Sequence, residues 1–119
     1  MTDIAPTKLA PITRDQIQSY AEAVGDFNPV HFDVDFAKAA GLPDTVVHGP
    51  LTVAKITDVL VAQLGVEALL NIDVRLRAPV HPGDELTVEG AEYGVSVRKA
   101  DGTVVATGVV ITREADPRP

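Results

Sequence analysis

The feature that most constrains this chain is a change of hydrophobic period near residue 69. Residues 50–64 are apolar at most positions, which predicts a helix covered by other structure on most sides. From residue 69 onward apolar and polar residues alternate, as where Asp73 separates Ile72 from Val74, and this pattern is typical of a half-buried strand. Helices followed by antiparallel strands predict an α+β fold, with one curved sheet wrapped around the helix of residues 50–64.

The rest of the second half continues the strand pattern. Leu76 and Ala78 extend the inward face of the first alternating segment, and further strands are expected at residues 85–89, 95–98 and 104–111. Asp101-Gly102 is a hairpin signal just before the last of them. An additional short strand at residues 7–12 is expected at a sheet edge, because two prolines flank or interrupt it.

The first half contains two short helices with clear start and stop signals. Thr13 to Gln16 fits a capping box, and Gly25 fits the left-handed position that ends a helix. Asp33 fits the N-cap of a second helix that stops at Gly41. The residues expected to face inward are Ile17, Tyr20, Ala21 and Val24 on the first helix, and Phe36, Ala37 and Ala40 on the second.

Length and charge exclude several classes of function. A chain of 119 residues is expected to form a single domain, residues 1–119, with a frayed tail from about residue 114. It has no cysteine, which excludes thiol nucleophiles and Cys-ligated metals, and its net charge of −7 argues against nucleic acid. The first residues lack the pattern of a signal peptide, and charged residues interrupt the apolar stretch, so we expect a cytoplasmic protein without a membrane span.

Polar residues able to do chemistry are concentrated between residues 20 and 51. Asp26, Asn28 and His31 share a loop fixed by Pro29, and His48 lies immediately before the apolar helix. Alone, Asp26 could cap this loop and His31 could sit half exposed. Together, a carboxylate and an imidazole five positions apart can hold one water molecule and move a proton. This arrangement suits the addition of water to an activated double bond.

The segment from His48 to Leu51 can serve a second purpose. The first amides of a helix are unpaired and point along the positive end of its dipole. Because Pro50 has no N–H, the donors near this turn are Gly49 and Leu51, and glycine lets a substrate carbonyl approach closely. The same residues would also serve an ordinary helix start. His48 fits a supporting or packed polar residue better than a base.

Other polar residues have plainer interpretations beside their functional ones. Thr57 could bond back to a carbonyl of the previous turn, or it could orient Asp26. Arg75 and Arg77 could be exposed strand residues, or they could meet the phosphates of an anionic cofactor. We expect His81 to face solvent. Asp26, His31 and Asp33 do not follow a strong metal-binding pattern, so no metal is expected.

The chain resembles the MaoC-like hydratases, the (R)-specific enoyl-CoA hydratases and related 3-hydroxyacyl dehydratases of the hot-dog fold. The matching residues are Tyr20-Ala21, Gly25 to Asp33, Ala37, Gly41, His48-Gly49 and a second block from Arg77 to Asp84. The resemblance covers about residues 13–110. It implies a single hot-dog domain that forms a homodimer, with an acyl-CoA or acyl-carrier thioester as substrate and no cofactor.

By this resemblance Asp26 and His31 are the catalytic pair, Asn28 helps to place them, and Gly49 donates its amide to the thioester oxygen. His48, Leu51 and Thr57 are expected to contact the substrate, and Pro50 stands where the family often has methionine. The implied reaction is reversible hydration of trans-2-enoyl thioesters and dehydration of (R)-3-hydroxyacyl thioesters. Two alternatives stay open, a subunit of a heteromeric dehydratase that needs a partner and a hot-dog acyl-CoA thioesterase.

Overall fold

The computed structural model of the protein describes residues 4–91 and 94–113, and the tail expected to fray from residue 114 lies outside them. Within these residues one antiparallel sheet has the strand order β1-β3-β4-β5-β2. Its strands are β1 (Thr7–Leu9), β2 (Leu69–Leu76), β3 (Leu86–Ala91), β4 (Gly94–Lys99) and β5 (Val104–Thr112). The short β1 lies at one edge, as predicted, and the longer β2 lies at the other.

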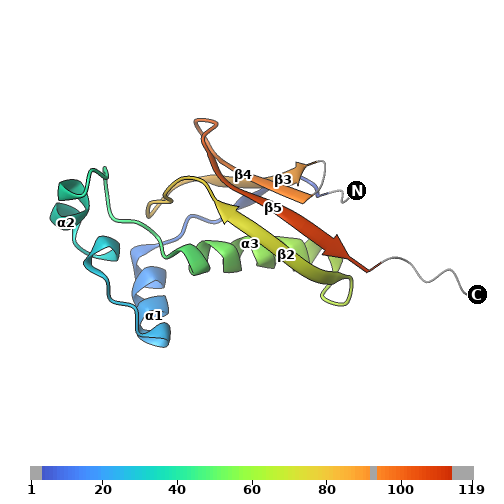
Figure 1. The fold of residues 1–119 in the computed structure, drawn as a ribbon, viewed down its shortest axis with the longest axis horizontal. Helices are drawn as coiled ribbons and strands as arrows, with labels where there is room; N and C mark the ends of the chain where they lie inside the picture. Colours follow the sequence, from blue (N-terminus) through green and yellow to red (C-terminus); the bar gives the residue numbers. More distant parts are fainter. Residues whose placement is uncertain (1–3, 92–93, 114–119) are drawn as a thin grey trace, which may run out of the picture.

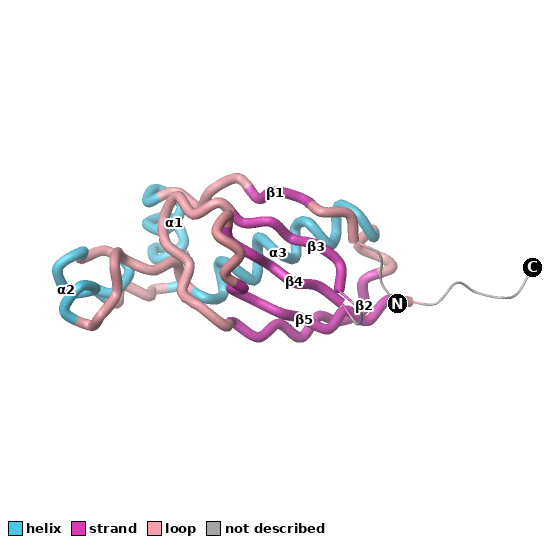
Figure 2. Tube along the Cα trace, turned by 90° about the horizontal axis from the view of Figure 1, so that it is seen from above, coloured by secondary structure: helices cyan, strands magenta, loops and turns pink. Residues whose placement is uncertain are grey.

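The apolar helix is α3 (Gly49–Leu64), and it lies along one face of the sheet (Figures 1 and 2). Ile56 and Leu60 on α3 are fully buried, as are Val88, Val97 and Val105 on three strands. These side chains belong to one core cluster, so the helix and the sheet form a single hydrophobic core. The predicted α+β hot-dog arrangement, a curved sheet against a central apolar helix, is confirmed.

The first helix, α1 (Arg14–Val24), begins at the predicted capping box. The Thr13 hydroxyl accepts from the Gln16 amide at 3.1 Å, and the Gln16 side chain accepts from the Thr13 amide at 2.9 Å. The helix ends at Gly25, whose φ of 74° is a left-handed conformation that favours glycine. Ile17 and Ala21 are buried as predicted, but Val24 is 54% exposed because the end of α1 extends beyond the sheet.

The segment between α1 and α3 contains the short 3₁₀ helix η1 (Pro29–His31) and the helix α2 (Val34–Ala39). Asp33 caps α2 as predicted, since its carboxylate accepts from the Phe36 amide at 3.1 Å. Ala37 is buried, whereas the predicted inward positions of Phe36 and Ala40 are wrong, because Phe36 is 47% exposed and Ala40 is also exposed. The reason is visible in Figure 1, where α2 stands away from the sheet and one helix face cannot reach the core.

The edge strand β2 differs from its sequence pattern at its end. Ile72 and Val74 pack against the core, but Leu76 is 47% exposed and lies near the start of α3 instead. In the part of the chain that the structure describes, no helix is long and apolar enough to cross a membrane.

Candidate active site

Asp26 and His31 converge on one point at the end of α1. Asp26 follows Gly25 directly, and its amide donates to the Ala21 carbonyl at 3.2 Å, which fixes the start of the loop. One carboxylate oxygen, Oδ1, accepts from the amide of Asn28 at 3.2 Å. The other oxygen, Oδ2, lies 3.9 Å from His31 Nε2, too far for a direct hydrogen bond. A single water molecule could therefore contact both groups.

Asn28 and the 3₁₀ helix bring His31 to this position. The Asn28 side chain accepts from the Val30 amide at 3.1 Å, which caps η1 and turns the chain so that His31 faces inward. The other ring nitrogen, His31 Nδ1, lies 2.8 Å from the Val46 carbonyl oxygen. Because a carbonyl only accepts, Nδ1 carries a proton, and in the neutral ring Nε2 is the nitrogen free to accept one.

His48 lies behind this pair and is almost completely buried, at 1% exposure. Its Nε2 donates to the backbone carbonyl of Asp26 at 3.1 Å, a contact that spans 22 positions of the chain. Its ring stacks on that of His31 with centroids 3.7 Å apart, and it contacts the Tyr20 ring at 4.9 Å. Its Nδ1 is buried and has no hydrogen-bond partner among the described residues. His48 therefore supports both catalytic candidates from behind.

Asp26, His31 and His48 each offer a ligand atom within 4.8 Å of the others, so they could be considered as a metal site. The stacking of the two rings, only 24° from parallel, argues against it. An imidazole nitrogen binds a metal along a lone pair in the ring plane, and stacked rings direct these lone pairs side by side. Asp33, also considered from sequence, caps α2 instead.

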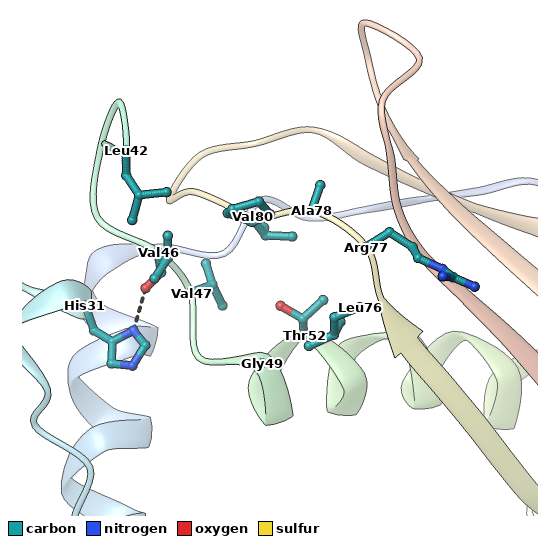
Figure 3. A pocket seen from close by; sticks show the side chains of 11 residues that line it. His31, Leu42, Val46, Val47, Gly49, Thr52, Leu76, Arg77, Ala78 and Val80 are labelled. Carbon is teal, nitrogen blue, oxygen red and sulfur yellow. Dashed lines mark hydrogen bonds between the residues drawn. The ribbon is translucent and has the colours of Figure 1, made fainter. Parts of the chain in front are cut away.

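A pocket of about 470 Å³ begins at His31 and extends along the start of α3 (Figure 3). Its walls come from α3, the loop after α2 and the chain that follows β2. The lining side chains are mostly apolar, and the residues are His31, Leu42, Val46, Val47, Gly49, Thr52, Leu76, Arg77, Ala78, Pro79 and Val80. The Val47 amide donates to the Val80 carbonyl at 2.8 Å, which joins two of these walls.

Of the first amides of α3, one is hydrogen-bonded within the protein and another is left at the pocket. The Leu51 amide donates to the His48 carbonyl at 3.0 Å, so it is already used. The Gly49 amide makes no hydrogen bond within residues 4–91 and 94–113, and Gly49 lines the pocket. Of the two donors that the sequence offered, the geometry leaves Gly49 free for a ligand oxygen.

The remaining predicted contacts lie elsewhere. Leu51 is in the hydrophobic core, and His48 is buried behind His31, so neither side chain lines the pocket. The Thr57 hydroxyl donates to the Val53 carbonyl at 2.8 Å, the plainer of its two interpretations, and does not bond to Asp26. Sequence reasoning missed Thr52, which is 2% exposed and lines the pocket one turn after Gly49. Its spacing of three residues from Gly49 could have indicated it.

The loop that forms one wall of the pocket is tied to α1 by charge. The Arg14 guanidinium donates to Asp44 at 3.1 Å and to the buried Thr45 hydroxyl at 3.1 Å. The Thr45 amide, followed by Arg14, holds the pKa of Asp44 below its usual value. His81 also joins this loop, because its Nδ1 donates to the Thr45 carbonyl at 2.8 Å; it is half-buried, so its predicted solvent-facing position is wrong.

Comparison with known proteins places this geometry in context. The family described as "MaoC like domain" matches residues 2–115. A mitochondrial 3-hydroxyacyl-(acyl-carrier-protein) dehydratase of Arabidopsis thaliana is 33% identical over 72 residues, 60% of this chain and 43% of that protein. The enoyl-CoA hydratase ChsH3 of Mycobacterium tuberculosis is 32% identical over 123 residues, 91% of this chain and 43% of that protein.

Among solved structures, an (R)-hydratase of A. caviae involved in PHA biosynthesis superposes with a TM-score of 0.74. The match covers 97% of this chain and 98% of that one at 24% identity, and it shows that the two share a fold. The two sequence relatives are longer, since this chain spans 43% of each.

Proposed function

Because this chain belongs to the MaoC-like domain family, we propose that it catalyses the reversible hydration of trans-2-enoyl thioesters and the dehydration of (R)-3-hydroxyacyl thioesters. One observation carries the proposal. The Asp26 carboxylate lies 3.9 Å from the His31 imidazole, and His31 and Gly49 line the same pocket. The dehydratase and the enoyl-CoA hydratase among the relatives support this reaction class.

In the hydration direction, Asp26 and His31 hold one water molecule between Oδ2 and Nε2. The water oxygen forms a bond to C3 of the enoyl group, and the π electrons move toward the thioester oxygen. His31 Nε2 is suited to accept the proton that the water loses, because the Val46 carbonyl holds the other proton on Nδ1. A proton delivered to C2 from the same pair completes the addition, with no cofactor required.

The thioester oxygen gains negative charge as the bond to C3 forms. The free Gly49 amide at the start of α3 is a suitable donor for it, and the helix dipole adds positive potential there. The apolar side chains of the pocket exclude water from around the acyl chain, and the exclusion of water strengthens these polar contacts.

Arg77 suits the recognition of the thioester carrier. It lines the pocket at the end away from His31 (Figure 3). Its Nε donates to the Thr107 hydroxyl at 3.2 Å. In a chain of net charge −7, a guanidinium at a pocket end favours an anionic group such as the phosphate of a phosphopantetheine arm. Both coenzyme A and an acyl-carrier protein present such a phosphate.

A second copy of this chain is the partner that suits the sheet. β2 is an eight-residue edge strand, and Leu70 on it and Val109 and Ile111 on the adjacent β5 are each about half exposed. A long apolar edge strand is normally paired or covered. We therefore propose a homodimer that covers this edge. Mass measurement of the purified chain distinguishes it from a subunit that needs a different partner, which would stay monomeric alone.

The proposed reaction is tested by incubating the purified chain with short and long trans-2-enoyl-CoA while following the absorbance of the conjugated double bond. Loss of that absorbance without release of free thiol supports a hydratase. Thiol release from saturated acyl-CoA instead would establish a thioesterase. No change with any thioester, in a chain shown to be folded and dimeric, would refute the proposal.

A further inference from the structure

Thr52 is a buried residue whose hydroxyl faces the pocket and bonds to no other group among the described residues. Thr52 is 2% exposed as a residue and lines the pocket, so the accessible part of its side chain is the part that meets the pocket. Thr57, in the same helix, shows the ordinary alternative, because its hydroxyl donates to the carbonyl four residues earlier. The Thr52 hydroxyl instead points from α3 into the pocket (Figure 3).

The backbone around Thr52 does not need this hydroxyl. The carbonyl of His48, four residues earlier, already accepts from the amides of Leu51 at 3.0 Å and Thr52 at 3.2 Å. The side chains that surround the hydroxyl across the pocket, such as Val47 and Leu76, are apolar and cannot bond to it. The hydroxyl is therefore available to donate a hydrogen bond to a ligand atom in the pocket.

Thr52 follows Gly49 by three residues in α3. Residues three apart lie on the same side of a helix, and helical side chains lean toward the preceding turn. The Thr52 side chain therefore leans toward Gly49, whose amide also has no hydrogen-bond partner among the described residues. Two unpaired donors thus border the same part of the pocket, one from the backbone and one from a side chain.

We propose that Thr52 is a catalytic residue whose hydroxyl donates a second hydrogen bond to the thioester oxygen held by the Gly49 amide. The inference rests on the proposed function and adds to it a two-donor oxyanion hole. When water adds to C3, the electron pair of the double bond moves to the thioester oxygen, and both donors bond more strongly to that oxygen than to the neutral carbonyl. Protonation at C2 by the Asp26 and His31 pair then restores the carbonyl.

Replacement by an isostere separates this role from packing. Thr52→Val keeps the shape of the side chain and removes the hydroxyl, while Thr52→Ser keeps the hydroxyl and removes a methyl group. We expect T52V to lower kcat for a trans-2-enoyl-CoA on the order of 10²-fold with little change in KM, because the missing bond matters most in the transition state. T52S should stay within about tenfold of wild type. Equal kcat for T52V and wild type, or an equal loss in both variants, would overturn the proposal.

A direct readout uses a thioester that cannot be hydrated. The carbonyl stretching band of a bound saturated [1-¹³C]butyryl-CoA moves to lower frequency with each hydrogen bond that the oxygen accepts. We expect a lower band in wild type and T52S than in T52V. Identical bands in wild type and T52V would overturn the role of Thr52 while leaving the proposed function intact. A wild-type chain that neither binds this probe nor hydrates any enoyl thioester would refute the proposed function, and the role of Thr52 with it.

Discussion

His48 offers a sharp test of how the proposed catalytic pair of Asp26 and His31 is supported, because its ring and its hydrogen bond can be removed separately. His48→Ala removes a ring that is almost fully buried and that packs against both His31 and Tyr20. Truncating a large buried side chain costs about 3 kcal/mol, and the lost bond to the Asp26 carbonyl adds about 1 kcal/mol. Removal of the unpartnered Nδ1 recovers about 1 kcal/mol, so H48A should lose about 3 kcal/mol.

His48→Phe keeps an aromatic ring in the stack but cannot donate to the Asp26 carbonyl. Its lost hydrogen bond and its relieved Nδ1 nearly cancel, and the larger ring costs about 1–2 kcal/mol through overpacking. H48F should therefore lose less stability than H48A. It should still lower kcat, because the backbone of Asp26 is no longer held at 3.1 Å from the ring.

Urea unfolding measures the free energy of unfolding of each variant, and the enoyl-CoA assay measures kcat. The reasoning would be refuted by an H48F variant that keeps wild-type kcat, since the bond to Asp26 would then have no positioning role. An H48A variant less than about 1 kcal/mol below wild type would show that the ring does not support the loop.

Three further predictions concern the pocket. Gly49→Ala places a Cβ 2.7 Å from Leu76 Cδ1, so we expect this variant to have lower activity. Adding Leu76→Ala should partly restore the activity, and a double variant without such rescue would contradict a clash with Leu76 as the cause. Arg77→Ala should raise KM for an enoyl-CoA but not for the corresponding N-acetylcysteamine thioester, which lacks phosphate, and equal effects on both would contradict phosphate recognition. Because folding lowers the pKa of Asp44, its ionised carboxylate stabilises the folded chain fully above the usual pKa of 3.8. This stabilisation is lost as the pH falls from 3.8 through the lowered pKa. Asp44→Asn should therefore destabilise the chain most at neutral pH and least in acid. Thermal unfolding from pH 7 to pH 3 measures the difference in stability between wild type and D44N, and a difference that does not change with pH would contradict this prediction.

Local patterns in the sequence predicted the elements that position the site. The capping box at Thr13, the left-handed Gly25 and the N-cap at Asp33 depend on neighbouring residues, and each forms as expected. The inward residues of the strands, such as Val88 and Val97, also follow from simple alternation. These features need no knowledge of the tertiary fold, because the contacts that decide them lie within one element or its cap.

The errors have a tertiary cause. Val24 and Phe36 follow a helical period, yet both are exposed because the end of α1 and all of α2 extend past the sheet. On α3 each residue advances about 100°, so Leu51 faces the core while Thr52 faces the pocket. A nearly uniform apolar sequence does not indicate which side meets the pocket. The sequence therefore indicated the residues that converge in the loop after α1 more accurately than it indicated the pocket wall.

The most direct test of the central claim compares hydration of trans-2-enoyl-CoA by wild type, Asp26→Asn and His31→Ala. We expect turnover by wild type and a loss of at least about 10²-fold in each variant, with thermal unfolding close to wild type. Near wild-type rates in both variants, or a wild-type chain that is folded but inactive, would contradict it.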